Sequence, residues 1–131
     1  MLAITEELRR VGVFYVATVD AQGQPHVRPF GAVAEFDGKA YLCTNNKKDC
    51  YRQMIAAPQI EISGTAPDGS WIRLTAKAKR DDRDEARAAM LEQNEGLKAM
   101  YAVGDGIFEV LSLEDAHCTR YSFTAPPVVL A

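Results

Sequence analysis

Short runs of β-branched and aromatic residues, separated by turn-forming residues, recur along most of the chain. Residues 14–19 form the first run, which ends in the turn-forming stretch 20–25, and residues 26–36 form the second. Asp37-Gly38 then predicts a tight hairpin into a third strand over 39–44. The first third of the chain is therefore predicted to be an antiparallel meander.

Pro29 lies inside the second of these predicted strands. Proline has no backbone N–H to donate to a strand ladder, so within sheets it is found at edges, bulges or breaks. The sequence thus predicts an edge, a bulge or a break near residue 29, where neighbouring backbone groups are free to bind something other than a strand.

Three segments have helical spacing of their apolar residues. Helices are predicted over 5–11, over 48–57, where Pro58 ends the run, and from Asp82 or Asp84 to about residue 93, with a further turn or two through Tyr101. The other strands are predicted where apolar and polar residues alternate, over 59–65, 71–79, 107–113 and 117–123.

Six or seven strands with short helices indicate a mostly β protein whose strands form a small antiparallel barrel. No internal repeat, low-complexity tract or linker divides the sequence. Residues 1–131 are therefore expected to form a single domain.

The composition excludes several classes of protein. Apolar residues make up 47% and charged residues 25% of the 131 residues, which is typical of a globular domain rather than a disordered one. With 15 basic and 18 acidic residues the net charge is −3, so no overall basic field exists to attract nucleic acid or an anionic membrane. Three cysteines without CxxC spacing argue against a disulfide framework and favour the cytoplasm.

The segment 44–49, Thr-Asn-Asn-Lys-Lys-Asp, lies where a predicted strand becomes a helix. Backbone N–H groups at the helix start, the positive end of the helix dipole and the ammonium groups of Lys47 and Lys48 can converge there on one anion, and a phosphate would fit. The alternative is that both lysines are simply solvated at the helix entrance.

Arg28-Pro29-Phe30 is the second candidate. A ladder interrupted at Pro29 leaves N–H and C=O groups free to bind the polar edge of a planar heterocycle, while Phe30 or Arg28 covers one face. The alternative is an ordinary edge strand in which the proline opposes aggregation.

Other residues have plainer interpretations. His26 and His117 lie far apart in sequence, without ligand-spaced partners, so no metal site is expected. Trp71 is interpreted as a core or interface anchor, with stacking on a ligand as the alternative. Cys43 is interpreted as a small buried apolar residue, and the charged run 83–87 as a solvated helix face with local ion pairs.

Three segments in order carry a family resemblance: FYVATVDAQGQPHVRPF, then KAYLCTNNKKDCYRQM with Pro58 closing the helix, then IEISGTAPDGSWIRLTAKAKRDD. Together they resemble the pyridoxamine 5′-phosphate oxidase-like family of FMN-binding split barrels, over nearly the whole chain. The resemblance implies a split β-barrel, FMN as the cofactor, and a homodimer with FMN at the subunit interface. The expected activity is that of an FMN-dependent oxidoreductase acting on an unidentified small molecule.

The resemblance also implies roles for individual residues. The backbone around Arg28, Pro29 and Phe30 would address the isoalloxazine edge. The ribityl chain and phosphate would be held by residues at the strand end and helix start, namely Thr44, Asn45, Lys47 and Lys48. Gln53 is expected to reach the cofactor from the same helix, and Trp71 to approach it from the partner subunit. No catalytic acid or base is identified.

The chain also departs from the true oxidase. Only TAPPVVLA follows Phe123, so the C-terminal Arg-x-His substrate motif has no counterpart, which argues against pyridoxamine phosphate as the substrate. Three alternatives stay open at this stage. They are a flavin or haem binding or sensing module without turnover, a deazaflavin in place of FMN, and a nucleic-acid-binding barrel, which the acidic net charge disfavours.

Overall fold

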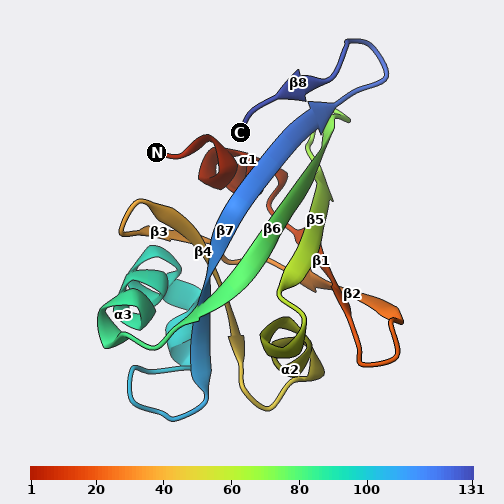
Figure 1. Cartoon of the computed structure of the whole chain (residues 1–131). Coiled ribbons are helices and arrows are strands. Elements are labelled where there is room, and N and C mark those ends of the chain that lie inside the picture. The colour runs from red at the N-terminus through yellow and green to blue at the C-terminus, as the bar shows by residue number, and fades with distance from the viewer.

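A computed structural model describes all residues, 1–131, and shows one antiparallel sheet with helices packed against it (Figure 1). The eight strands are β1 (Phe14–Val19), β2 (Pro25–Phe30), β3 (Ala34–Phe36), β4 (Lys39–Asn45), β5 (Gln59–Thr65), β6 (Trp71–Asp81), β7 (Phe108–Tyr121) and β8 (Val128–Val129). The helices are α1 (Ala3–Val11), α2 (Asp49–Ala56), α3 (Asp84–Gln93) and the 3-10 helix η1 (Glu95–Ala99). None of them is long and apolar enough to span a membrane.

The strand order is β2-β1-β5-β6-β7-β4-β3, with β8 added to the side of β7. Every neighbouring pair is antiparallel. The two ends of this path, β2 and β3, remain unpaired to each other, so the sheet is a barrel that stays split. The predicted fold, a mostly β antiparallel split barrel with short helices, is confirmed.

The second predicted strand, over 26–36, is in fact divided in two. β2 ends at Phe30, residues 31–33 belong to no strand, and β3 then starts at the other edge of the sheet. Pro29 pairs with Tyr15 of β1 on one side of β2, and the other side has no strand. The edge and the break predicted from Pro29 are therefore both present.

The two strands predicted over 107–113 and 117–123 are wrong, because β7 runs without interruption from Phe108 to Tyr121. The pairing with β6 shifts register between Thr75 and Lys77, and Asp115 takes up the extra residue with a φ of 50°. Aspartate is one of the few residues that adopts this left-handed conformation readily. The turn-like residues near 115 thus form a bulge within one strand.

Two apolar clusters hold the helices to the sheet. The larger has 16 buried residues, and Leu8 of α1 and Met54 of α2 enter it between the strands. The smaller has 7 buried residues, in which Ala86, Met90 and Leu91 of α3 pack against β3, β4 and β7. Burial of this kind contributes roughly 25 cal/mol per Å² of apolar surface, and it fixes where α2 and α3 lie.

The interpretation of residues 83–87 as a solvated face is wrong for Arg87. Its side chain is only 10% exposed and forms an ion pair with the carboxylate of Glu109, which is 6% exposed. The two groups are 3.0 Å apart, and Arg87 also donates to the backbone oxygen of Phe108 at 3.0 Å. The start of α3 is thus held to β7 through buried charge.

Candidate functional site

The turn between β4 and α2 is organised by Asn45, the last residue of β4. Its Oδ1 accepts a hydrogen bond from the backbone N–H of Lys47 at 3.1 Å, and its backbone oxygen accepts one from Lys48 at 3.2 Å. Lys48 is the N-cap residue of α2. Both lysine side chains are exposed, and neither forms an ion pair with a carboxylate. Two uncompensated positive charges therefore lie at the start of a helix, where the dipole adds to them.

The end of β2 forms the opposite side of this region. Phe30 is half-buried and its ring lies 6.3 Å from that of Phe14, which anchors the strand end to the core. Residues 31–33, which follow it, pair with no strand. Their backbone groups are therefore free of ladder hydrogen bonds.

Between these two features lies a pocket of about 480 Å³, which we call the α2 pocket. Its first wall comes from the end of β2, the end of β4 and the start of α2: Arg28, Pro29, Phe30, Gly31, Ala32, Cys43, Thr44, Lys48 and Cys50. Its second wall comes from residues 94–97, 100 and 101. The structure thus brings together five of the residues proposed from sequence, namely Arg28, Pro29, Phe30, Thr44 and Lys48.

Arg28 and Gln53 interact with each other at the base of this region. The Nη1 of Arg28 donates to the Val16 backbone oxygen at 3.1 Å and to Thr18 Oγ1 at 2.7 Å, and its Nη2 donates to Gln53 Oε1 at 3.3 Å. Thr18 Oγ1 also donates to Gln53 Oε1 at 2.5 Å. Gln53 does not line the pocket, and its visible role is to hold α2 against β1 and β2 through Arg28.

Three other proposed residues lie outside the lining. Asn45 and Lys47 flank the pocket at the turn described above. Trp71 lies elsewhere, at the start of β6, where its ring is 5.9 Å from Tyr121 and 5.0 Å from Phe123. Within this one chain, Trp71 therefore has no access to the α2 pocket.

The pocket also contains thiols. Cys43 is half-buried rather than fully buried as its alternation predicts, and it lines the pocket. Burial raises the pKa of Cys43 to about 12, although the charge of Lys48 acts in the opposite direction. Cys50 is buried, with its Sγ 3.5 Å from Thr44 Oγ1. At neutral pH Cys43 is thus a neutral, weakly polar group rather than a nucleophile.

The second wall was missed by sequence reasoning. Asn94 Nδ2 donates to the backbone oxygens of Val33 at 3.0 Å and Met90 at 3.1 Å, which fixes the turn from α3 into η1. Leu97 and Tyr101 pack against the smaller core cluster. Their helical spacing was the only local signal, and it indicated packing rather than a binding surface.

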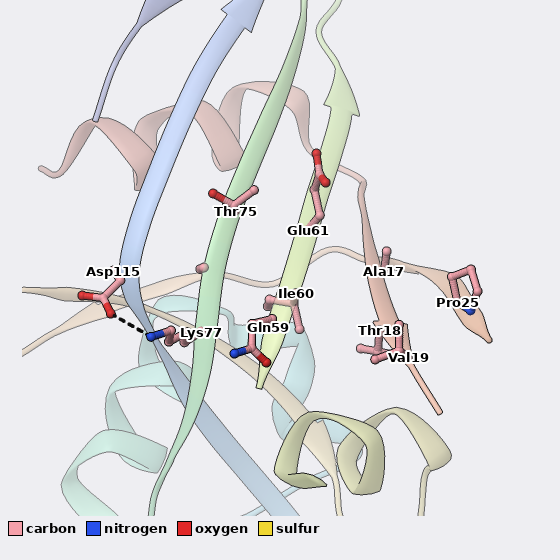
Figure 2. A pocket seen from close by; sticks show the side chains of 11 residues that line it. Ala17, Thr18, Val19, Pro25, Gln59, Ile60, Glu61, Thr75, Lys77 and Asp115 are labelled. Carbon is pink, nitrogen blue, oxygen red and sulfur yellow. Dashed lines mark ion pairs between the residues drawn. The ribbon is translucent and has the colours of Figure 1, made fainter. Parts of the chain in front are cut away.

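A second concavity of about 470 Å³ lies over β1, β5, β6 and β7. Figure 2 shows Ala17, Thr18 and Val19 on one side of it, and Lys77 paired with Asp115 on the other. Lys77 is the one basic residue that lines this concavity, and its Nζ lies 3.5 Å from Asp115 Oδ2, so its charge is already compensated. This groove lacks the free positive charge and the helix start of the α2 pocket, and we regard it as the weaker candidate for a phosphate ligand. No three or more His, Cys, Asp or Glu side chains cluster as a metal site.

Comparison with known proteins shows the family of the chain. A family model described as pyridoxamine 5′-phosphate oxidase matches residues 2–114, which include both walls of the α2 pocket. The chain belongs to the pyridoxamine 5′-phosphate oxidase family. The resemblance proposed from the three sequence segments is thereby confirmed.

Solved structures with the same fold extend the comparison. A NimC/NimA family protein from Clostridium acetobutylicum is 46% identical, with a TM-score of 0.93 over 97% of this chain and 88% of that one. A heme binding protein from Mycobacterium smegmatis is 22% identical, with a TM-score of 0.75 over 95% of this chain and 56% of that one.

A pyridoxamine 5′-phosphate oxidase-related, FMN binding protein from Nostoc punctiforme is 16% identical, with a TM-score of 0.68 over 97% of this chain and 93% of that one. At these lower identities the likeness concerns the fold alone. No functionally curated protein matches the chain.

Proposed function

We propose that this protein binds FMN in the α2 pocket and acts as a flavin-dependent oxidoreductase on a small molecule. The observation that carries the proposal is the convergence, in one pocket, of the positively charged start of α2 with the unpaired backbone that follows β2. These two features match the two ends of a flavin mononucleotide, which are a phosphate and a planar heterocycle. The FMN binding relative of the same fold supports the choice of this ligand.

The residues present fit this cofactor by the chemistry of their donors. Lys48 and the first N–H groups of α2 supply charge-assisted donors for a phosphate. Pro29, Phe30 and the unpaired backbone of Gly31 offer an apolar surface beside free polar groups, which suits the edge and face of a heterocycle. When bound, FMN supplies hydride or electron transfer, and the protein supplies binding and orientation.

A haem ligand is the alternative, because a heme binding protein has the same fold. Histidine and cysteine thiolate are common haem-iron ligands. Neither His26 nor His117 lines the α2 pocket, and Cys43, which does, has a pKa raised to about 12 and is therefore not a thiolate at neutral pH. The pocket therefore favours the flavin. Pyridoxamine phosphate is not the substrate that we propose, since the Arg-x-His motif is missing after Phe123.

The partner that we propose is a second copy of this chain. The outer face of β1 and β2 exposes Tyr15 by 49% and Val27 by 66%, and Phe123 beside Trp71 is 93% exposed. Exposed apolar groups gathered in this way are typical of an interaction surface. A symmetric dimer through this face would also bring each Trp71 toward the other copy. All three cysteines are free, and the compartment that we propose is the reducing cytoplasm.

The test is a titration of the purified protein with FMN, followed by absorption and by quenching of flavin fluorescence. Lys48→Ala is expected to weaken FMN binding by about 1–2 kcal/mol, below the ~1.5–3 kcal/mol of a hydrogen bond to a charged group because Lys48 is exposed. Lys47→Ala is the matched control, since Lys47 does not line the pocket, and it should cost less. A wild-type protein that leaves the flavin spectrum unchanged would show that the proposal is wrong.

A further inference from the structure

Asn45, proposed from sequence as a cofactor ligand, has both polar atoms of its side chain engaged within the protein. Its Oδ1 accepts from the Lys47 backbone N–H at 3.1 Å, and its Nδ2 donates to the hydroxyl oxygen of Tyr101 at 2.9 Å. Asn45 does not line the α2 pocket, whereas Tyr101 does. Of these two residues, Tyr101 is therefore the one that is placed to contact a molecule in the pocket.

The position of Tyr101 is set by the sheet. Its ring stacks on Phe108, with the centroids 4.8 Å apart and the planes inclined by 27°. Phe108 is in turn the register partner of Asn45 across β4 and β7. One strand pairing thus places both the aromatic ring that stacks on Tyr101 and the amide that donates to it next to each other.

The hydroxyl hydrogen of Tyr101 has no acceptor within the protein. The hydroxyl oxygen accepts the amide N–H of Asn45. A phenolic hydroxyl both donates and accepts, so this hydrogen is available to a ligand in the pocket. A half-buried donor of this kind, fixed by stacking and by one hydrogen bond, is already oriented before a ligand arrives.

We propose that the Tyr101 hydroxyl binds the polyhydroxyl chain of FMN, and that Asn45 acts on the cofactor only by positioning Tyr101. The inference rests on the proposed function, because it assigns a contact within the same pocket. Tyr101 is hydrogen-bonded to Asn45, which lies three residues before Lys48 at the phosphate end. Tyr101 belongs to the second wall of the pocket, whereas Lys48, Pro29 and Phe30 all belong to the first. The chain is the part of FMN that connects phosphate and heterocycle, and its hydroxyl groups accept hydrogen bonds.

The test uses three flavins that share one ring system: FMN, riboflavin, which lacks the phosphate, and lumiflavin, which lacks the whole chain. Tyr101→Phe keeps the stacking on Phe108 and removes only the hydroxyl. It is expected to weaken both FMN and riboflavin by about three- to tenfold, the range for one hydrogen bond between neutral groups, and to leave lumiflavin unchanged. Lys48→Ala is the matched control and should weaken FMN alone.

A double-mutant cycle tests the role of Asn45. Riboflavin is the ligand, because it has no phosphate, and any effect of Asn45→Ala on phosphate binding is then absent from the measurement. Asn45→Ala should weaken riboflavin binding in the wild-type background about as much as Tyr101→Phe does, and should add less than twofold in the Tyr101→Phe background. Equal midpoints of urea unfolding for the wild type and Tyr101→Phe would show that the hydroxyl is not needed for folding.

The outcomes separate this inference from the function on which it rests. If the wild type binds none of the three flavins, the proposed function fails. If the wild type binds them and Tyr101→Phe binds riboflavin equally well, the Tyr101 contact is wrong. A loss of lumiflavin binding in Tyr101→Phe would place the contact at the ring, and equal effects of Asn45→Ala in both backgrounds would exclude the positioning role.

Discussion

Replacing Glu109 by glutamine removes one charge from the most buried ionic cluster in the protein. The carboxylate of Glu109 accepts hydrogen bonds from Asn46 Nδ2, Arg80 Nε and Arg87 Nη2, each at 3.0 Å. Its side chain is 6% exposed, and that of Arg87 is 10% exposed. The cluster joins the turn after β4, the end of β6, the start of α3 and β7, so its loss is expected to weaken the attachment of α3 to the sheet and to lower the free energy of unfolding.

The expected magnitude follows from what remains paired. Removing one partner of a buried ion pair costs about 3–5 kcal/mol when the other charge is left alone. Glutamine keeps one acceptor oxygen, and Arg87 keeps the Asp82 carboxylate at 2.8 Å, the Asp84 carboxylate at 3.1 Å and the Phe108 backbone oxygen. We therefore expect Glu109→Gln to lower the free energy of unfolding by about 2–3 kcal/mol at pH 7.

The effect should depend on pH in a defined direction. Burial by itself would raise the pKa of Glu109, but the hydrogen bonds from Asn46, Arg80 and Arg87 outweigh it and leave the pKa below its ordinary value of 4.5. A carboxyl group of this kind stabilises the fold fully above its unfolded pKa, and the contribution is lost as the pH falls through the folded pKa. The difference between wild type and Glu109→Gln should thus be largest at pH 7 and should shrink below about pH 4.5.

Urea unfolding followed by the fluorescence of Trp71, at pH 7, 5 and 3.5, measures this difference. Glu61→Gln is the matched control, because Glu61 pairs with Arg73 at 3.0 Å but its side chain is 41% exposed. An exposed pair contributes about 0–1 kcal/mol, so the control should lose little stability at any pH. If Glu109→Gln costs no more than Glu61→Gln, or costs the same at pH 3.5 as at pH 7, the reasoning about the buried cluster is refuted.

Three further predictions concern packing, assembly and reactivity. Gly64→Ala should destabilise the protein by about 1–3 kcal/mol in urea unfolding, because an added Cβ would lie 2.8 Å from Cγ2 of Val11. Gly96→Ala is the control: an added Cβ there would meet nothing within 4 Å, so the free energy of unfolding should change by no more than ~0.5 kcal/mol. Val27→Arg places a charge on the proposed dimer face and should shift sedimentation toward the monomer, while an unchanged sedimentation coefficient would exclude this face. Cys43 should react slowly with iodoacetamide at pH 8, as judged by mass spectrometry of the native protein, because its raised pKa of about 12 keeps it protonated; labelling within minutes would contradict this.

The parts of the fold that sequence predicts well are those determined by neighbouring residues. Asp37-Gly38 specifies the turn between β3 and β4, where both residues have a positive φ, and Pro58 closes the run of α2. The prediction of two strands in place of β7 was wrong because the outcome depends on residues that are distant in sequence. Asp115 has the composition of a turn, but its left-handed conformation is absorbed as a bulge because β6 continues to pair on both sides of it. Only the long-range pairing decides between these two outcomes.

The same distinction applies to the site. The first wall of the α2 pocket comes from two short segments, around Pro29 and around Lys48, and each carries its own local signal of a proline in a strand or lysines at a helix start. Gln53 could be placed on the correct helix, but its hydrogen bonds with Thr18 and Arg28 link three elements, and no spacing along the chain predicts them.

The first two residues of β7, Phe108 and Glu109, explain why the second wall could not be predicted from the sequence. Phe108 supports the ring of Tyr101, and its neighbour Glu109 binds Arg87 at the start of α3. The second wall, residues 94–101, therefore follows Arg87, which binds Glu109, and ends at Tyr101, which stacks on Phe108. Both contacts are made to β7, and β7 pairs with β4, whose end belongs to the first wall. We therefore expect a change in the buried ion pair to alter the position of the second wall of the pocket. We expect Glu109→Gln to loosen this wall before it unfolds the sheet, so that riboflavin binding weakens at urea concentrations where the fluorescence of Trp71 is still that of the native protein.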